Sequence, residues 1–535
     1  MKRLVILTIL LMNVVAAASS AQTLPPTIRP TLAGWVQGTQ QGNVVSFKGI
    51  PYAQPPVGDL RWKAPLPPTP WTGLRPAMSF GAKCIQPTFN PDTGDVTGTD
   101  PSASEDCLML NVWEPAGAAQ GLLPVLFFIH GGNYLNGAAS DSKNGSYLYD
   151  GGYLAEHGPA VVVTIDYRLG ALGFLANRAM AGESGQDGFG NYGVQDAIRA
   201  LTWVQNNIAF FGGDPARVMV FGQSAGAFMA CTLMAIPTAR GLFSRVIMES
   251  GACQVYPRTV TEGNGDKLAT ALGCDGKPDV PACLRAVDPN IVAIKLTPSF
   301  LEGTDGVTYR PNIDGTLLTQ SPEDAFLAGT HNHVPLMITG TQAEFSKTLK
   351  FYLGGTIPGD EPGYRVAIGQ LITKLHLGNA TVDEVEARYP LSTYIFPFWG
   401  LTALMTDVGL TGSRRIAREV AGSQNEPVRR GHFYGGLSGP NAVYGAFHGI
   451  DMAYVFRSFG YFGDTTPTST ELAISDAVIG YWARFAATGD PNGPGAVNWP
   501  QFDAVTDPFL ALGPVIGSGT GLHTDNCDYW ESVLY

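Results

Sequence analysis

The segment from Arg217 to Ala230 constrains the fold of this chain more than any other. An apolar, β-branched run from Val218 to Phe221 leads directly into Gly222-Gln-Ser-Ala-Gly226, and helix-forming residues follow. A glycine on each side of Ser224 lets a strand and a helix approach closely, while the serine adopts a strained conformation that lifts its hydroxyl out of the turn. The pattern predicts a nucleophile elbow. Five such residues also fit an ordinary turn, so motifs elsewhere in the chain must decide between the two interpretations.

Composition limits the kinds of partner that the chain can have. The 535 residues are 45% hydrophobic and 15% charged, which is enough to bury a large core as one domain or several. The formal net charge is −12 and the sequence pI is about 5.1. Nucleic acids and anionic lipids require surfaces rich in Lys and Arg, so neither is an expected partner.

The N-terminus has the pattern of a secretory signal peptide. Two basic residues precede an apolar run from Leu4 to Ala18, and small residues follow up to Ala21. A membrane anchor is the weaker alternative, because the run is shorter than the ~20 residues that span a bilayer. We therefore expect residues 1–21 to be removed, residues 22–535 to form a single domain without an integral membrane segment, and the protein to be secreted or periplasmic.

Six strand-like runs alternate with helical patterns along the chain. They are Leu108 to Trp113, Val125 to Ile129, Val161 to Ile165, Val218 to Phe221, Val246 to Met248 and Leu336 to Ile338. The clearest helical pattern runs from Val194 to Phe211. This alternation predicts an α/β fold with a large, mostly parallel sheet covered by helices on both faces. Residues 253–330 and 357–425 are interpreted as helical insertions over that sheet.

Two early segments are expected to be loops. Residues Phe47 to Trp62 are dense in Pro and Gly, which favours an ordered loop over a helix. Cys84 and Cys107 enclose a polar segment with Phe89 as its one aromatic residue, and a disulfide there would close a compact loop. Two buried thiols are the alternative. Export permits disulfides, and the odd total of seven cysteines leaves at least one outside an intramolecular pair.

The run from Val125 to Ile129 ends in His130-Gly131-Gly132-Asn133. In an open α/β sheet this exit would place unobstructed backbone N–H groups at the carboxyl edge of the strands, where ligands bind. The N–H of Ala225 would add a donor from the elbow. A tight turn at the end of a strand is the simpler interpretation of the two glycines. Their position about one hundred residues before the serine motif favours the donor interpretation instead.

An acid and a base follow the serine in the chain. Glu344 lies just beyond the strand-like run that ends near Ile338, and His448 lies in the small-residue loop Gly445-Ala-Phe-His-Gly449. The remaining later histidines are 331, 333, 376, 432 and 523. A metal at His331 and His333 lacks further ligands at a convincing spacing, so a polar loop is preferred there, and His432 is interpreted as structural. The order Ser224, Glu344, His448 is that of α/β-hydrolases.

These motifs together resemble the type-B carboxylesterase/lipase family, which includes the cholinesterases and has an α/β-hydrolase fold. The resemblance covers nearly the whole mature chain. The motifs that carry it are Phe47 to Trp62, Glu105 to Val112, His130 to Gly132, Thr164 to Arg168, Asn191 to Asp196, Phe211 to Pro215, Gly222 to Gly226, Glu249 to Gly251 and His448 to Phe456.

The resemblance implies a role for each matched residue. Ser224 would be the nucleophile, His448 the base and later the acid, and Glu344 the carboxylate that holds the imidazole. The oxyanion hole would consist of the backbone N–H groups of Gly132, Asn133 and Ala225. Two local disulfides, Cys84 with Cys107 and Cys274 with Cys283, are implied, and the pairing of Cys231, Cys253 and Cys527 is open. Ester hydrolysis through an acyl-enzyme requires no cofactor or metal.

Three residues depart from the family pattern. Asn133 replaces a third glycine, and asparagine tolerates positive φ better than most residues. Gln223 replaces a common glutamate, which should make the site less attractive to cationic esters. Phe345 follows the acid where glycine is common, and the sequence offers no explanation for it.

The resemblance implies a small-molecule ester as substrate. The segment between Cys84 and Cys107 is short and polar, unlike the amphipathic lid of family lipases, so small to medium soluble esters are expected. A lipase, an amidase or a specialised detoxifying hydrolase on the same triad, and a non-catalytic adhesion protein, are the alternatives. The aromatic segment Tyr394 to Trp399 either lines the substrate gorge or belongs to the core.

Overall fold

The computed structural model describes residues 25–117, 121–184, 188–297 and 307–535. The predicted signal segment, residues 1–21, lies outside this range. Within it, no helix is both long and apolar enough to cross a membrane.

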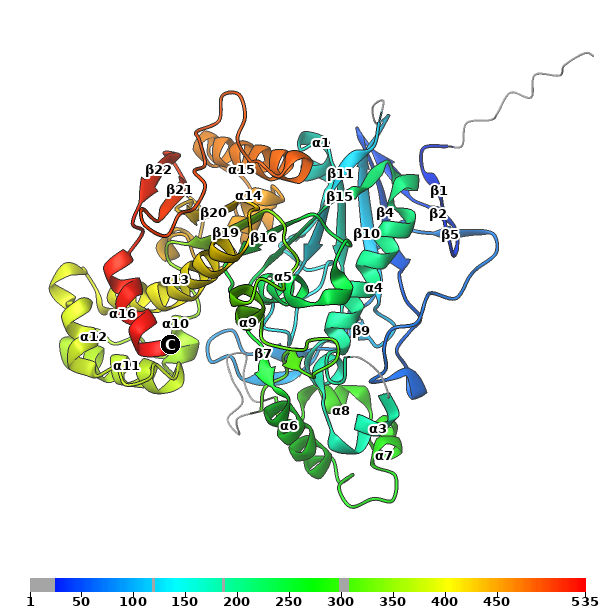
Figure 1. Ribbon diagram of the computed structural model, residues 1–535, viewed down its shortest axis with the longest axis horizontal. Coiled ribbons are helices and arrows are strands. Elements are labelled where there is room, and N and C mark those ends of the chain that lie inside the picture. Colours follow the sequence, from blue (N-terminus) through cyan, green and yellow to red (C-terminus); the bar gives the residue numbers. More distant parts are fainter. Residues whose placement is uncertain (1–24, 118–120, 185–187, 298–306) are drawn as a thin grey trace, which may run out of the picture.

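One sheet of eleven strands organises the molecule (Figure 1). From edge to edge the strands are β22 (Gly517–Thr520), β21 (Pro508–Leu512), β20 (Val428–Phe433), β19 (Leu336–Thr341), β16 (Arg245–Glu249), β15 (Gly213–Gln223), β11 (Leu123–Ile129), β14 (Val161–Ile165), β10 (Met109–Pro115), β4 (Val44–Pro51) and β3 (Thr39–Gln41). In this sheet order, each strand from β14 across to β21 pairs in parallel with its neighbour in that range, and antiparallel strands complete both edges. The predicted α/β class and mostly parallel sheet are confirmed.

The central strands are buried on both faces, and their alternate residues enter two separate cores. Val125, Phe127 and Ile129 of β11 belong to one core, whereas Leu126 and Phe128 belong to the other. This period of two follows from the pleat of a strand. It explains why these strands are continuous apolar runs rather than alternating ones.

Helices cover both faces of the sheet. The first core includes α2 (Gly170–Phe174), α4 (Tyr192–Asn207), α5 (Ala225–Ala235), α9 (Pro322–Leu327) and the second half of α13 (Pro397–Ser423). The second core includes α1 (Gly152–His157), α14 (Asp451–Val455) and α15 (Ser469–Thr488). The helix predicted from Val194 to Phe211 is α4 followed by a 3₁₀ turn at Ile208–Phe211.

Two helical insertions extend the sheet domain (Figure 1). One contains α6 (Arg258–Ala271), α7 (Val280–Ala286) and α8 (Pro289–Ile294), and α3 (Ala181–Ser184) lies near it. The other contains α10 (Leu349–Tyr352), α11 (Glu361–Lys374), α12 (Val382–Arg388), the first half of α13, and α16 (Thr524–Leu534). This second lobe has a hydrophobic cluster of its own, into which the fully buried Trp530 of α16 packs.

The six predicted strands are present, but the expected loop from Phe47 to Trp62 is partly wrong. Residues 47–51 belong to β4, which lies inside the sheet between β10 and β3. The glycine that suggested a loop marks a bulge: Gly49 has φ +72°, its N–H donates to Asn111 Oδ1, and the pairing with β10 shifts register there. A Cβ at Gly49 would lie 2.8 Å from the Ser79 carbonyl oxygen, so the strand requires glycine at that position.

Three disulfides are formed, Cys84–Cys107, Cys231–Cys253 and Cys274–Cys283, and Cys527 is a buried free thiol. Within the Cys84–Cys107 segment lie the short strands β6 (Lys83–Cys84), β7 (Pro87–Phe89), β8 (Val96–Thr99) and β9 (Ala103–Ser104). Gln86 in this segment exchanges two hydrogen bonds with the backbone of Gly137, so the segment is fastened to the loop that follows β11.

A buried ion pair fastens the loop after β14 to α4. The Arg168 guanidinium donates to both carboxylate oxygens of Asp196 at 2.8 and 2.7 Å, and the Arg168 backbone N–H donates to the same carboxylate. Both side chains are almost fully buried. A bidentate pair of this kind is strongly destabilising when one partner is removed, because the other charge is left buried alone.

We expect Asp196→Asn to lower the free energy of unfolding by about 3–5 kcal/mol. The matched control is Asp383→Asn, which breaks the ion pair of Asp383 with Arg365 at the surface, where such pairs contribute about 0–1 kcal/mol. Urea denaturation followed by tryptophan fluorescence measures both. Equal losses in the two variants would contradict a special role for the buried pair.

Candidate active site

Ser224 lies at the junction between β15 and α5, in a strained backbone conformation with φ 58° and ψ −121°. The flanking glycines make this junction possible. A Cβ at Gly222 would lie 2.5 Å from the backbone of Gly226, and a Cβ at Gly226 would lie 2.0 Å from the carbonyl oxygen of Ile129. The start of α5 therefore packs directly against the end of β11, and the predicted strand, turn and helix are all present.

The loop after β11 lies against this elbow. A Cβ at Gly131 would lie 3.0 Å from Ser224 Cβ, and one at Gly132, whose φ is +107°, would lie 2.0 Å from the Asn136 carbonyl oxygen. Asn133 follows with φ 56°, the left-handed conformation that asparagine tolerates. The stretch Gly131 to Asn133 is thus brought beside the first turn of α5, where the Ala225 N–H has no acceptor within the helix.

His448 and Glu344 are held together by backbone as well as side-chain contacts. The His448 N–H donates to the Glu344 carbonyl oxygen at 2.9 Å, and residues 343 and 447 form an isolated β-bridge. His448 Nδ1 lies 2.5 Å from Glu344 Oε2, while Glu344 Oε1 accepts from the Thr341 N–H at 2.7 Å. The loop after β19 and the loop before α14 therefore hold Glu344 and His448 together as one unit.

The charges of this pair shift both pKa values. Burial lowers the pKa of His448, but the charge and hydrogen bond of Glu344 outweigh it, and the net pKa lies above its usual value. Burial raises the pKa of Glu344, but His448 and the Thr341 N–H outweigh it, and the net pKa lies below its usual value. The pair thus favours a carboxylate facing an imidazole that gains a proton readily.

Gln223 lies beside the other imidazole nitrogen. Its Nε2 is 3.1 Å from His448 Nε2, so the amide N–H donates to the unprotonated nitrogen of the ring. The amide is buried, and Gly131 and Gly449 border it. Among the described residues, Gln223 rather than Ser224 is the side-chain hydrogen-bond partner of His448 Nε2. The residue before the serine therefore contacts the His448 ring directly, which its sequence pattern did not reveal.

The three side chains line one cavity of about 660 Å³. Asn133 also lines it, and aromatic residues form much of its wall: Phe228, Phe345, Phe351, Tyr352 and Tyr535. None of residues 394–399 is among the lining residues, and Ile395 and Phe396 are largely exposed to solvent. The aromatic segment singled out in the sequence therefore does not line this cavity.

Phe345 lies beside the His448 ring. Its ring is parallel to the His448 ring, with centroids 6.2 Å apart and an interplanar angle of 8°, and it contacts Tyr352 edge-on. A glycine at this position could not make either contact. Phe345 therefore forms part of the cavity wall beside the imidazole.

A second pair of carboxyl groups, Glu249 and Asp451, lies buried near His448, and the sequence analysis did not assign it. Burial and the neighbouring Asp451 raise the pKa of Glu249. Burial and the charge of Glu344 raise the pKa of Asp451 to about 7. Two adjacent carboxyl groups cannot both ionise cheaply, so the pair retains a proton near neutral pH and limits the negative charge around the imidazole.

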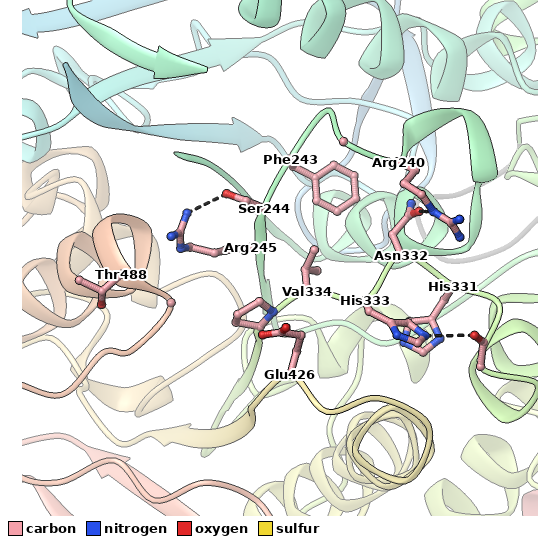
Figure 2. A pocket seen from close by; sticks show the side chains of 14 residues that line it. Arg240, Phe243, Ser244, Arg245, His331, Asn332, His333, Val334, Glu426 and Thr488 are labelled. Carbon is pink, nitrogen blue, oxygen red and sulfur yellow. Dashed lines mark hydrogen bonds between the residues drawn. The ribbon is translucent and has the colours of Figure 1, made fainter. Parts of the chain in front are cut away.

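One further histidine, His376, also lines the cavity that contains Ser224, whereas His331, His333 and His432 lie elsewhere. His331 and His333 line a second pocket of about 770 Å³, in which Arg240 and Asn332 lie on one side and Arg245 on another (Figure 2). This pocket adjoins the amino ends of β16 and β19. Ser224 and Glu344 follow the carboxyl ends of parallel strands, so the pocket lies at the opposite end of the strands from these two residues. His331 bonds Gln424 at 3.1 Å. His432 is fully buried in β20, as expected of a structural residue.

The sheet order and the strand–serine–helix junction define an α/β-hydrolase fold. The sequence model of the carboxylesterase family matches residues 25–530. The chain is 34% identical over 487 residues to the para-nitrobenzyl esterase of Bacillus subtilis (strain 168), covering 90% of this chain and 94% of the relative. It is 32% identical over 522 residues to the fumonisin B1 esterase of Sphingopyxis macrogoltabida, covering 96% and 91%.

A solved structure of a PNB esterase matches 95% of this chain and 100% of its own, with a TM-score of 0.77 and 30% sequence identity. The chain therefore belongs to the carboxylesterase family and is an enzyme of that class, as the sequence motifs implied.

We expect Gln223→Glu to move the pH dependence of activity upward. A carboxylate beside His448 stabilises the imidazolium and raises its pKa by about 1 unit or more. The unprotonated base then forms at higher pH, so the rising limb of the kcat/KM profile shifts in that direction. Ester hydrolysis measured from pH 5 to 9 gives the limb. The matched control is Gln424→Glu, which places a carboxylate beside His331 and should leave the limb in place. An unmoved limb in Gln223→Glu would contradict the contact.

Proposed function

We propose that the protein is a serine carboxylic-ester hydrolase in which Ser224 is the nucleophile, His448 the base and Glu344 the group that orients the base. The observation that carries the proposal is the convergence of these three side chains on one cavity, with the imidazole held by Glu344 and the serine raised on a strained turn. This is the arrangement that nucleophilic catalysis requires.

The proposed reaction has an acylation step and a deacylation step. Ser224 Oγ attacks the ester carbonyl while His448 Nε2 takes its proton, and the imidazolium is stabilised by the Glu344 carboxylate. The backbone N–H groups of Gly132, Asn133 and Ala225 donate to the oxyanion of the tetrahedral intermediate. The imidazolium then protonates the leaving alkoxide. Water, activated by the same imidazole, hydrolyses the acyl-enzyme and restores Ser224.

For His448 Nε2 to act on Ser224, the hydrogen bond from Gln223 must loosen or be shared. This follows because one lone pair on that nitrogen accepts from the amide in the free enzyme. Catalytic hydrogen bonds commonly tighten only once substrate is bound. We infer that substrate binding shifts the ring from Gln223 toward Ser224, and that Phe345, parallel to the ring, limits this movement.

We propose small to medium soluble esters as the substrates. The cavity is of the size that holds a ligand of that class. The Cys84–Cys107 segment is fastened by the disulfide and by the Gln86–Gly137 hydrogen bonds, and no residue of it lines the cavity. A lid that opens on lipid would need a looser and more apolar segment. Relatives named as a para-nitrobenzyl esterase and a fumonisin B1 esterase also support an ester substrate.

We further propose that the protein works outside the reducing cytosol as a single catalytic domain. Three disulfides support this location, because such bonds persist in oxidising compartments. Removal of a signal segment ending at residue 21 would deliver the chain there. N-terminal sequencing of the exported protein tests the cleavage position.

We expect Ser224→Ala to lower kcat for p-nitrophenyl esters by roughly 10⁴- to 10⁶-fold with little change in folding. The matched control is Ser532→Ala, an exposed serine on α16, which should retain full activity. Hydrolysis of p-nitrophenyl esters from C2 to C16, with circular dichroism of each variant, measures both properties. Retained activity in Ser224→Ala would eliminate the proposed nucleophile.

The same ester series tests substrate size. A maximum at short or medium acyl chains is expected from the fastened Cys84–Cys107 segment. Activity that rises toward C16, or that increases sharply on emulsified triglyceride, would show that the enzyme is a lipase instead.

A further inference from the structure

One wall of the catalytic cavity contains a buried arginine that the proposed mechanism does not use. Arg310 lies two residues before the short strand β18 (Asn312–Ile313), which pairs with β17 (Tyr256–Pro257). Its side chain is part of the cavity lining, together with Ser224 and His448, and the residue is only 7% exposed. A guanidinium in this position is withdrawn from bulk water and faces the space that substrate occupies.

Arg310 differs from the other buried arginines in its partners. In the described ranges, five further arginines are buried, and each forms an ion pair with a carboxylate: Arg61 with Glu105, Arg168 with Asp196, Arg414 and Arg430 with Asp507, and Arg429 with Asp490. Within the same ranges Arg310 forms no ion pair. A buried charge without a counterion is costly, and arginine remains charged at every physiological pH.

The contacts of Arg310 leave donors for a ligand. One Nη2 hydrogen bond goes to Asn133 Oδ1 at 3.0 Å, and Cζ lies 5.8 Å from the centre of the Tyr256 ring. A guanidinium carries five N–H donors, so this amide satisfies a small part of its capacity. The carboxylate of Glu344, which also lines the cavity, is already bound to His448 and the Thr341 N–H.

The contact with Asn133 fixes where Arg310 acts. Asn133 supplies one of the proposed oxyanion N–H groups, and its side chain lies against the guanidinium. A group bound by Arg310 would therefore lie near the scissile carbonyl, within the same substrate molecule. The planar fork of arginine matches a carboxylate, to which it can donate two parallel hydrogen bonds.

We propose that Arg310 binds a free carboxylate of the substrate, and that the enzyme prefers acidic esters, such as half-esters of dicarboxylic acids, to neutral ones. This inference rests on the proposed ester hydrolysis and names its substrate class. The reaction itself is unchanged: water cleaves the ester to an alcohol and a second carboxylate, and one proton is released at neutral pH. The buried charge that lacks a counterion in the described protein receives one from the substrate.

The experiment compares substrates that differ only in this charge. Monomethyl succinate, glutarate and adipate carry the free carboxylate, and their dimethyl esters carry none; acetylated hydroxy acids and their methyl esters place the carboxylate on the alcohol side instead. Methanol or acetate release is measured for the wild type and for Arg310→Gln. We expect the wild type to prefer the charged member of at least one series, and Arg310→Gln to lose about 10- to 100-fold in kcat/KM for it.

Two matched variants make the test specific. Arg310→Lys retains the charge without the planar fork and should recover part of the preference. Arg240→Gln removes an exposed guanidinium from the pocket at the opposite end of the strands (Figure 2), where Arg240 bonds Asn332 and the Thr330 carbonyl oxygen, and should leave the preference intact. For Arg310→Gln, kcat/KM for the neutral diesters should fall by much less than kcat/KM for the half-esters, and circular dichroism establishes that the variant folds.

The outcomes separate this inference from the ester-hydrolase proposal. A wild type that hydrolyses charged and neutral esters equally well overturns the inference and leaves ester hydrolysis standing. Equal losses on both ester classes in Arg310→Gln also overturn it, because Arg310 would then act only by positioning Asn133. If no ester is hydrolysed, calorimetric titration of Ser224→Ala with monomethyl and dimethyl adipate tests the carboxylate site separately. Tighter binding of the half-ester, lost when Arg310→Gln is added, supports the carboxylate site although the hydrolase proposal fails. Equal binding of the two esters overturns the carboxylate site.

Discussion

The close approach of α5 to the ends of β15 and β11 is the constraint on which the site depends. It exists because residues 131, 222 and 226 lack side chains: a Cβ at any of them would lie 2.0 to 2.8 Å from neighbouring backbone atoms. This packing forces Ser224 into a conformation that costs of order 1–3 kcal/mol and is maintained by the surrounding sheet. Because the central strands are buried on both faces, the rigid core of the protein supplies the free energy that keeps the strained serine in place.

The electrostatics of the site depend on how much charge surrounds His448. Glu344 stabilises the imidazolium, and a second ionised carboxylate at the same distance would raise the pKa of His448 further, so the unprotonated imidazole would form only at higher pH. Two features limit the total negative charge around His448. The residue before the serine is the neutral amide of Gln223, and burial keeps a proton on the Glu249–Asp451 pair. The basicity of His448 is therefore set by three surrounding groups as well as by Glu344.

Much of the fold could be predicted from the sequence, because the core strands are uninterrupted apolar runs. A strand that is buried between two cores must be apolar on both faces. β4 was missed, since its bulge at Gly49 has the composition of a loop while Asn111 supplies the hydrogen bond that keeps it in the sheet. The placing of Ser224, Glu344 and His448 near one another could be predicted from motifs at the carboxyl edge of the sheet. Their roles stay predictions until the serine is replaced.

The positions of Gln223, Phe345 and Arg310 could not be predicted, because each depends on contacts between segments far apart in the chain. Phe345 contacts His448, 103 positions away, and Arg310 contacts Asn133, 177 positions away. The sequence analysis used the net charge of −12 to exclude nucleic acids and anionic lipids as partners, but that charge describes the whole chain rather than the site. A protein that is acidic overall can hold one desolvated cation in its catalytic cavity, and at short range that cation determines which charge a ligand can carry. The acidic exterior slows the approach of anionic esters only over about one Debye length, whereas the buried guanidinium acts at hydrogen-bond distance, so the local charge decides selectivity once the ester has entered.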